Sequence, residues 1–226
     1  MLAGHAQTPP PPVPQVNLTF KAVTLGRGIT GMSYIVQGKK TPFYPPALNL
    51  SPPLHYSGPY KLEFSQTQTI NDQPAEVPVA QLAFPLDTPE VMVLFAPSRT
   101  QPGKYIAVAV PNAEADSPRN SARVINYSGR PLPIALNEDR SIMQPNEVKI
   151  VKLPKGTLEV FIPRIIKLSA DQAEVSSQSY RIPKGGRMTL LVVPSGMNKS
   201  AEDESVSLYE LNEPPAPPKP KSQAGQ

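Results

Sequence analysis

The stretch SGPYKLEFSQ, residues 57–66, returns in altered form as PKGTLEVFIP, residues 154–163. The two align through Gly58 and Gly156 and through a shared Leu-Glu pair. Further pairs follow in the same order: DQPAEV from Asp72 with DQAEV from Asp171, Phe84-Pro85 with Ile182-Pro183, and VLFAPS from Val93 with LLVVPS from Leu190. Self-similarity in a kept order indicates a duplicated structural unit. The sequence therefore predicts two tandem copies of one fold.

The similarity extends beyond these stretches in both directions. Upstream, YIVQGKKTP from Tyr34 lies over RVINYSGRP from Arg123, and each reads as a strand that runs into a glycine turn and a proline. Downstream, each copy adds another strand pattern, KYIAVAV from Lys104 and SVSLYEL from Ser205. Each copy then holds about six or seven strands in fewer than about a hundred residues, which is the size of an immunoglobulin-like sandwich.

Proline decides the fold class. The chain of 226 residues contains 31 Pro and 13 Gly, and proline breaks helix interiors because it lacks an N–H donor. Short runs rich in Val, Ile, Leu, Tyr and Thr lie between the prolines, which is the pattern of many short strands. We predict an all-β protein made of two tandem immunoglobulin-like β-sandwich domains.

Composition also sets the predicted domain limits. Residues 1–15 and 213–226 are rich in proline, which predicts disordered spacers at both ends. The polar stretch 111–121 has turn formers and no apolar periodicity, so it is the expected linker. Domain 1 is then expected over 16–112 and domain 2 over 119–212. Alternation in RVINYS and VKIVKL predicts four core residues in domain 2: Val124, Val148, Ile150 and Leu153.

The sequence offers little for catalysis. It has no cysteine and two histidines, His5 and His55, which excludes thiol chemistry and leaves zinc short of ligands. Gly26, Gly28 and Gly31 fit the spacing of a dinucleotide-binding loop, but a strand pattern follows them and no acidic residue stands about twenty positions on. We favour a turn at these glycines. The prediction is a protein that is not an enzyme and uses no metal or cofactor.

The N-terminus predicts export. Gly4-His5-Ala6 places small residues before Gln7 where signal peptidase would cut, although an apolar core region is missing. We interpret these residues as the end of a signal peptide, with a cytoplasmic tail as the alternative. The longest apolar runs, such as Val91 to Ala96, are too short to cross a bilayer as a helix, so no transmembrane segment is predicted. The expected location is secreted, periplasmic or on the outer surface of a bacterium.

Charge is unevenly placed along the chain. Residues 27–118 carry six Lys or Arg and seven Asp or Glu, whereas residues 119–197 carry twelve and six. The second unit is therefore expected to attract acidic partners, such as a polyanionic glycan, lipid head groups or an acidic protein face. Few aromatics accompany these cations, which argues against nucleic acid, and a solvated face of mixed charge is the alternative. The candidate basic face comprises Arg123, Arg130, Lys149, Lys152, Lys155, Arg164, Lys167, Lys184 and Arg187.

Residues 41–64, TPFYPPALNLSPPLHYSGPYKLEF, gather many of the chain's aromatic residues among prolines. Rigid aromatic side chains suit binding surfaces for sugar rings or for a protein partner. The alternative is a loop folded over the open end of the sandwich, because soluble proteins rarely expose large apolar patches. The candidate contact residues are Phe43, Tyr44, His55, Tyr56 and Tyr60.

At HYSGPYKLEF, ARVINYSGRPLPIAL and TLLVVPSG, the chain resembles uncharacterised secreted bacterial proteins with two immunoglobulin-like sandwiches, some of them associated with type IV pilus genes. The resemblance covers most of residues 30–196. It rests on turn and strand patterns, so it implies architecture and location but no binding residue. Two-domain periplasmic pilus chaperones are similar in size and charge, yet their paired Arg/Lys anchor and alternating donor strand are not found here.

Two functions from different classes follow. The first is a non-enzymatic cell-envelope protein that acts by contact with a protein partner or by self-association, as a component of a pilus or surface assembly. Exposed sheet edges, or an acidic unit facing a basic one, would carry that contact. The alternative is a glycan-binding adhesion module for mucin or polyanionic sugar, with residues 43–60 as its aromatic platform. An enzyme is the third hypothesis.

Overall fold

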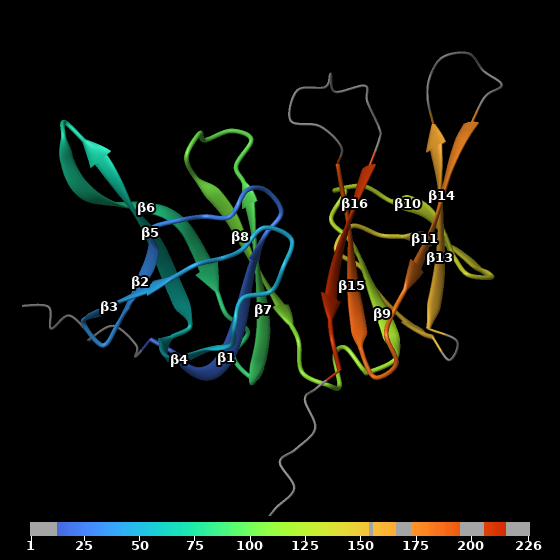
Figure 1. Ribbon diagram of the computed structural model, residues 1–226, viewed down its shortest axis with the longest axis horizontal. Coiled ribbons are helices and arrows are strands. Elements are labelled where there is room, and N and C mark those ends of the chain that lie inside the picture. The colour runs from blue at the N-terminus through green and yellow to red at the C-terminus, as the bar shows by residue number, and fades with distance from the viewer. Residues whose placement is uncertain (1–12, 154–155, 166–172, 195–205, 216–226) are drawn as a thin grey trace, which may run out of the picture.

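The computed structural model describes residues 13–153, 156–165, 173–194 and 206–215, which form strands and no helix (Figure 1). The first half contains β1 (Gln15–Thr24), β2 (Met32–Val36), β3 (Lys39–Phe43), β4 (Leu54–Pro59), β5 (Lys61–Ile70), β6 (Gln73–Ala83), β7 (Glu90–Pro97) and β8 (Tyr105–Pro111). The second half contains β9 (Ser121–Asn126), β10 (Leu132–Leu136), β11 (Asp139–Met143), β12 (Val148–Lys152), β13 (Thr157–Ile165), β14 (Ala173–Arg181), β15 (Arg187–Pro194) and β16 (Val206–Glu213). No described segment is a helix of the length and hydropathy that crossing a membrane requires.

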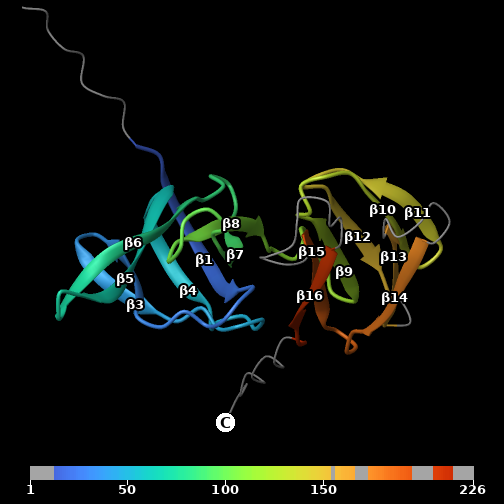
Figure 2. The ribbon, with the colours of Figure 1, turned by 90° about the horizontal axis from the view of Figure 1, so that it is seen from above.

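The strands form two four-stranded sheets in each half. The orders are β4-β1-β7-β8 and β3-β2-β5-β6 in the first half, and β12-β9-β15-β16 and β11-β10-β13-β14 in the second. Adding eight to each strand number converts one half into the other, so every strand has a counterpart. Each half has one parallel pair, β1 with β7 and β9 with β15. The halves lie side by side (Figures 1 and 2), and the predicted all-β class with two domains is confirmed.

The counterpart strands agree with the downstream part of the sequence alignment. Leu62 on β5 and Leu158 on β13 are both buried, as are Val93 on β7 and Leu190 on β15. In each pair the two residues lie on counterpart strands, as the alignment placed them.

The upstream part of the alignment is wrong. Tyr34 lies on β2, whose counterpart is β10, whereas Arg123 lies on β9, the counterpart of β1. The true match to the β2–β3 turn is the β10–β11 turn, and Gln37 and Asn137 begin these turns with φ of 50° and 54°. Among the described residues, each half has eight strands, whereas six or seven were predicted. RVINYSGRP and YIVQGKKTP share the pattern of a strand that runs into a glycine turn and a proline, which explains the wrong match.

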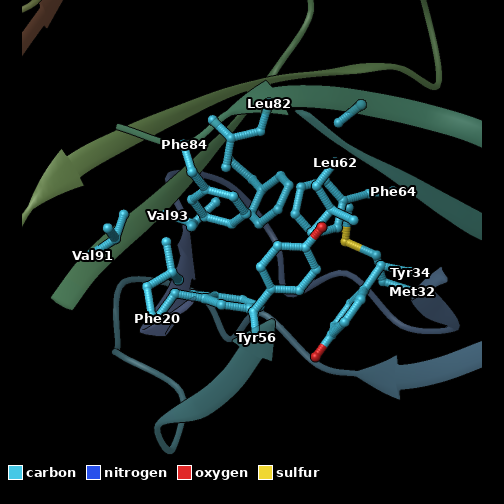
Figure 3. Close-up of a cluster of buried hydrophobic side chains, with 14 of the residues drawn as sticks. Phe20, Met32, Tyr34, Tyr56, Leu62, Phe64, Leu82, Phe84, Val91 and Val93 are labelled. Atoms are coloured by element: carbon cyan, nitrogen blue, oxygen red, sulfur yellow. The ribbon is translucent and has the colours of Figure 1, made fainter. Parts of the chain in front are cut away.

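Aromatic rings fill the core of the first half (Figure 3). Phe20 on β1 lies 5.9 Å from the ring of Tyr34 on β2, and Phe64 on β5 lies 5.1 Å from Phe95 on β7, measured between ring centroids. These rings come from both sheets, so the two sheets enclose one core. In the second half the buried core residues are aliphatic or methionine, among them Leu132, Leu136, Met143, Leu158 and Leu190.

Two of the four predicted core residues of the second half are buried and two are not. Val124 and Leu153 are buried, as predicted. Val148 and Ile150 are 49% and 42% exposed, and Val151 turns inward instead and packs against the core. An alternating strand fits either face, because a shift of one residue exchanges its two sides. In VKIVK both faces carry an apolar residue, so the alternation could not choose between them.

The glycines near residue 28 form a turn between β1 and β2, as favoured from the sequence. Gly31 has φ of 68°, a left-handed conformation that glycine adopts without steric cost. At Gly28 a Cβ atom would overlap the hydroxyl group of Tyr44, so the close approach of that ring requires glycine.

Candidate functional site

The two halves meet through the sheets that contain β1 and β9, which face each other at the centre of Figure 2. We call this contact the seam. Its buried apolar residues are Val23, Met92, Leu94 and Val110 from the first half and Ile125, Leu191 and Leu211 from the second. All six residues of β9 are buried, because alternate side chains enter the seam and the core of the second half. The halves are thus joined by a continuous apolar contact.

A buried carboxylate holds one end of the seam. Glu213, at the end of β16, accepts hydrogen bonds from Arg187 Nε at 3.0 Å and from Lys21 Nζ at 2.7 Å. Asn112, just after β8, donates a third from Nδ2 at 3.0 Å. Lys21 and Asn112 belong to the first half, so this one side chain links both halves.

Arg123 extends the same set of contacts. It is 1% exposed, and its guanidinium donates to Thr189 Oγ1 at 2.9 Å and to Asn112 Oδ1 at 2.9 Å. A further bond goes to the backbone carbonyl of Pro111. We refer to Lys21, Asn112, Arg123, Arg187, Thr189 and Glu213 as the polar cluster. Buried polar groups with partners of this kind fix the geometry of a contact because leaving any of them unpaired is costly.

The surroundings shift the acidity of two members of the polar cluster. Burial alone would raise the pKa of Glu213, but hydrogen bonds from Arg187, Lys21 and Asn112 outweigh it and lower the pKa to about 2. Burial and the nearby Arg187 charge lower the pKa of Arg123 to about 10, against the opposing effect of Glu213. Both side chains therefore stay charged at neutral pH.

The segment between β8 and β9 is tied into the seam rather than loosely strung between the halves. Asn112 and Ser117 are buried. Arg187 donates to the backbone carbonyl of Ser117 at 2.8 Å and to that of Asn112 at 3.0 Å. The polar composition of this segment, which predicted a linker, thus also serves the contact between the halves.

A groove of about 560 Å³ lies along the seam. We call it the junction groove. Leu25, Ile106 and Val108 line it from the first half, and Tyr127, Val193 and Tyr209 from the second. Arg99, also in its lining, donates from Nη2 to the backbone carbonyl of Pro194 at 3.2 Å and so connects the two walls. Neither half forms this groove alone.

The chemistry of the junction groove is apolar with a few polar groups. Ile106 is 56% exposed, which leaves an apolar side chain open to an incoming group. Burial raises the pKa of Tyr127, partly offset by the charge of Arg123, so its hydroxyl stays neutral and can donate a hydrogen bond. Concave sites of this size, with apolar walls and sparse polar groups, are typical of binding sites.

The predicted aromatic contact residues do not form one surface. Tyr56 is buried in the core, so its ring cannot meet a ligand, and Phe43 is half-buried and packs against Phe20 and Phe64. Tyr60 is half-buried and packs on the same core. Tyr44 and His55 are exposed. The proline-rich segment folds its rings inward because the sandwich interior offers them apolar contacts that water does not.

The predicted basic face is also divided. Arg123 and Arg187 lie in the polar cluster, so the prediction that they form an exposed face is wrong. Lys149 is half-buried and donates to Ser141 Oγ at 2.5 Å, and Arg130 is half-buried. Lys152 and Lys184 are exposed. Lys155 and Lys167 lie outside the described residues, as does the side chain of Arg164.

No protein-family model and no curated protein matches this chain. Within the described residues, no three His, Cys, Asp or Glu side chains gather where they could hold a metal ion. Functional inference therefore rests on the geometry of the seam and its groove.

The seam was not predicted from the sequence, although a signal for it was present. VMVLF on β7 and LLVV on β15 are unbroken apolar runs, whereas a strand with one solvent face alternates. Such runs indicate strands that are buried on both faces. Two copies of a sandwich with one such run each predict that the copies pack together through those sheets.

Proposed function

We propose that this protein is a non-enzymatic binding protein of the bacterial cell envelope that holds an apolar part of a partner protein in the junction groove. The observation that carries the proposal is a groove of about 560 Å³ built by both halves, with Ile106, Val108 and Tyr209 on its walls. Its volume lies in the range of sites that bury a ligand of moderate size. The envelope location and the association with a pilus rest on the sequence patterns described above.

The seam supports this proposal because it fixes the two walls of the groove relative to each other. A preformed site loses less conformational entropy on binding than one that must assemble. The polar cluster at Glu213 and the bond from Arg99 to Pro194 both join the halves. The tandem arrangement then has a direct role, since each half supplies one wall.

We also propose that each half is a variant of the immunoglobulin-like sandwich. Its two four-stranded sheets and its shared core support this proposal. The parallel pairing of β1 with β7, and the order β4-β1-β7-β8, differ from the antiparallel order of the common immunoglobulin forms.

Site-specific crosslinking tests the proposed contact. A photoreactive phenylalanine analogue replaces Ile106 in the groove, and in a control it replaces Ile142 on β11, which is 61% exposed. After irradiation with a bacterial envelope fraction, we expect one discrete adduct from position 106, identified by mass spectrometry, and none from position 142. The additional change Val108→Glu removes the adduct if the groove binds the partner. Equal adducts from both positions, or persistence with Val108→Glu, contradict the proposal.

The alternative of glycan binding is favoured by one observation, the two tyrosines Tyr127 and Tyr209 in the groove wall. Aromatic side chains with a polar tip suit sugar rings. A glycan array probed with the native chain and with Tyr209→Ala tests it. Retention of a glycan by the native chain, and its loss in the variant, would replace the protein partner by a sugar.

A further inference from the structure

The backbone hydrogen bonds of β12, an edge strand beside β9, alternate in direction. Asn126 N–H donates to the Glu147 carbonyl at 3.1 Å, and Leu153 N–H donates to the Asn120 carbonyl at 2.8 Å. The register between these two bonds is unbroken. In an antiparallel ladder, bonded and non-bonded pairs alternate. The bonded residues inside β12 are therefore Lys149 and Val151.

The remaining residues of β12 direct their N–H and C=O groups away from β9, toward the open edge of the sheet. They are Val148, Ile150 and Lys152. Val148 is 49% and Ile150 is 42% exposed, and Lys152 is exposed as well. An edge that combines outward backbone groups with apolar side chains is a template for a further strand.

The first half has two prolines, Pro52 and Pro53, directly before its own edge strand β4. Phe20 pairs with Leu54, as Ala122 pairs with Val151, and both couples join the first strand of a half to its edge strand. Continued beyond Leu54, this register would set Pro53 at the place of Ile150 and Pro52 at the place of Lys149, but the Ser51 N–H binds the Ala22 carbonyl and shifts the register there. Proline has no N–H to offer to an added strand.

Two other edge strands of the first half contain prolines within the strand. Pro42 lies on β3, and Pro74 and Pro78 lie on β6. In the second half, β11 and β12 contain no proline. β11 carries Asp139 and Arg140 at its exposed edge, whereas β12 carries a single charge, Lys152, among its outward residues. Charges and prolines are the usual devices that block strand addition.

We propose that β12 pairs antiparallel with β12 of a second copy of this chain, centred on Ile150, so that two four-stranded sheets become one continuous sheet. In this register Ile150 faces Ile150 of the second copy, and Val148 faces Lys152. Every outward residue then meets another outward residue, so the backbone groups of both edges pair. No lysine lies directly opposite another lysine, which would be unfavourable.

The second copy fits this edge better than a chain of other sequence because the strand is complementary to itself in both hydrogen-bond direction and side-chain size. The contact is isologous, so it closes at the dimer. The two basic second halves repel each other across it. Salt therefore strengthens this dimer by screening, whereas it would weaken a head-to-tail pair of an acidic and a basic half.

Light scattering after size-exclusion chromatography of the full chain, over about 1 to 200 µM protein, tests the proposal. The native chain is expected to shift from one to two copies, with a dissociation constant that falls as salt is raised from about 0.05 to 0.5 M. Ile150→Lys is expected to weaken the dimer at least about tenfold, because it sets two like charges opposite each other at its centre. The matched control Ile142→Lys, on β11, leaves the dissociation constant unchanged.

Hydrogen exchange separates loss of pairing from loss of folding. The amides of Val148 and Ile150 are expected to be protected at high protein concentration and to exchange freely on dilution or in Ile150→Lys, while those of β9 stay protected throughout. A monomer at every concentration, a dimer indifferent to Ile150→Lys, or growth beyond two copies overturns the proposal. None of these results affects the crosslink expected from the junction groove, so the two proposals fail separately.

Discussion

The two halves share one strand order but differ in the composition of their cores and in the residues on their sheet edges. The first half fills its core with aromatic rings and places prolines on its edge strands, whereas the second has an aliphatic core and an open edge at β12. Strand order thus survives a complete change of core chemistry, because any apolar set of suitable volume fills the space between two sheets. Edges differ more freely, since they decide what the molecule contacts rather than whether it folds.

The seam shows the same divergence at counterpart positions. Lys21 on β1 corresponds to Arg123 on β9, and Asn112 after β8 corresponds to Glu213 on β16. Asn112 and Glu213 meet each other across the seam. One carboxylate, supplied by the second half alone, therefore gathers cations from both halves.

The largest expected effect comes from truncating a ring of the aromatic core. Phe64→Ala removes ring contacts with Tyr34, Phe43 and Phe95 and should lower the free energy of unfolding by about 4 kcal/mol. Leu158→Ala, in the aliphatic core on the counterpart strand β13, should cost about 3 kcal/mol. Urea denaturation followed by circular dichroism measures both. A smaller loss for Phe64→Ala than for Leu158→Ala would contradict the assignment of the first core to its rings.

Breaking the polar cluster should come next in size. Arg187→Ala leaves Glu213 buried without its bidentate partner, which should destabilise the protein by about 3 kcal/mol. Asp139→Asn, at an exposed carboxylate 3.5 Å from Lys149, is the control and should change little. Equal midpoints in urea for the two variants would show that the cluster does not hold the halves together.

Acid should weaken the seam over a defined range of pH. Glu213 has a pKa of about 2 in the folded protein against an ordinary value of 4.5. Its depressed pKa contributes stability that is fully present above pH 4.5 and is lost as the pH falls toward 2, about 2 to 3 kcal/mol in all. Comparison of the native chain with Glu213→Gln isolates this contribution from other carboxylates. The stability difference between the two should shrink through this range, and a constant difference would exclude Glu213 as its source.

The smallest effect on stability is expected from replacing a proline beside the edge strand β4 of the first half. Pro53→Ile replaces the proline directly before β4 with the residue that β12 carries next to Val151, and it should change the free energy of unfolding by less than about 1 kcal/mol. If proline closes the edge, the variant should associate beyond two copies in light scattering, which the native chain does not. An unchanged mass would show that proline at this position does not decide association.

Much of the architecture was predictable from sequence, and the part that was not has a physical cause. Proline content and apolar runs predicted an all-β chain in two units, and the match of Leu62 with Leu158 located counterpart strands. The alternation of apolar and polar residues led to the wrong prediction that Val148 and Ile150 are buried, because alternation does not show which face of a strand is buried. The prediction of an exposed basic face was wrong at Arg123 and Arg187. A count of charged residues does not show that a sheet of the other half covers two of them.

The central claim is that the seam fixes the two halves relative to each other and so shapes the groove. The chain has no cysteine, so spin labels attach only where a cysteine is introduced. Two exposed positions suit this purpose, with the substitutions Gln81→Cys on β6 and Ser179→Cys on β14. A pulsed electron spin resonance measurement then reports the distance between the halves. A fixed seam predicts one narrow distance distribution that broadens when Arg187→Ala is added. A broad distance distribution in the labelled protein with its polar cluster intact would contradict a fixed seam.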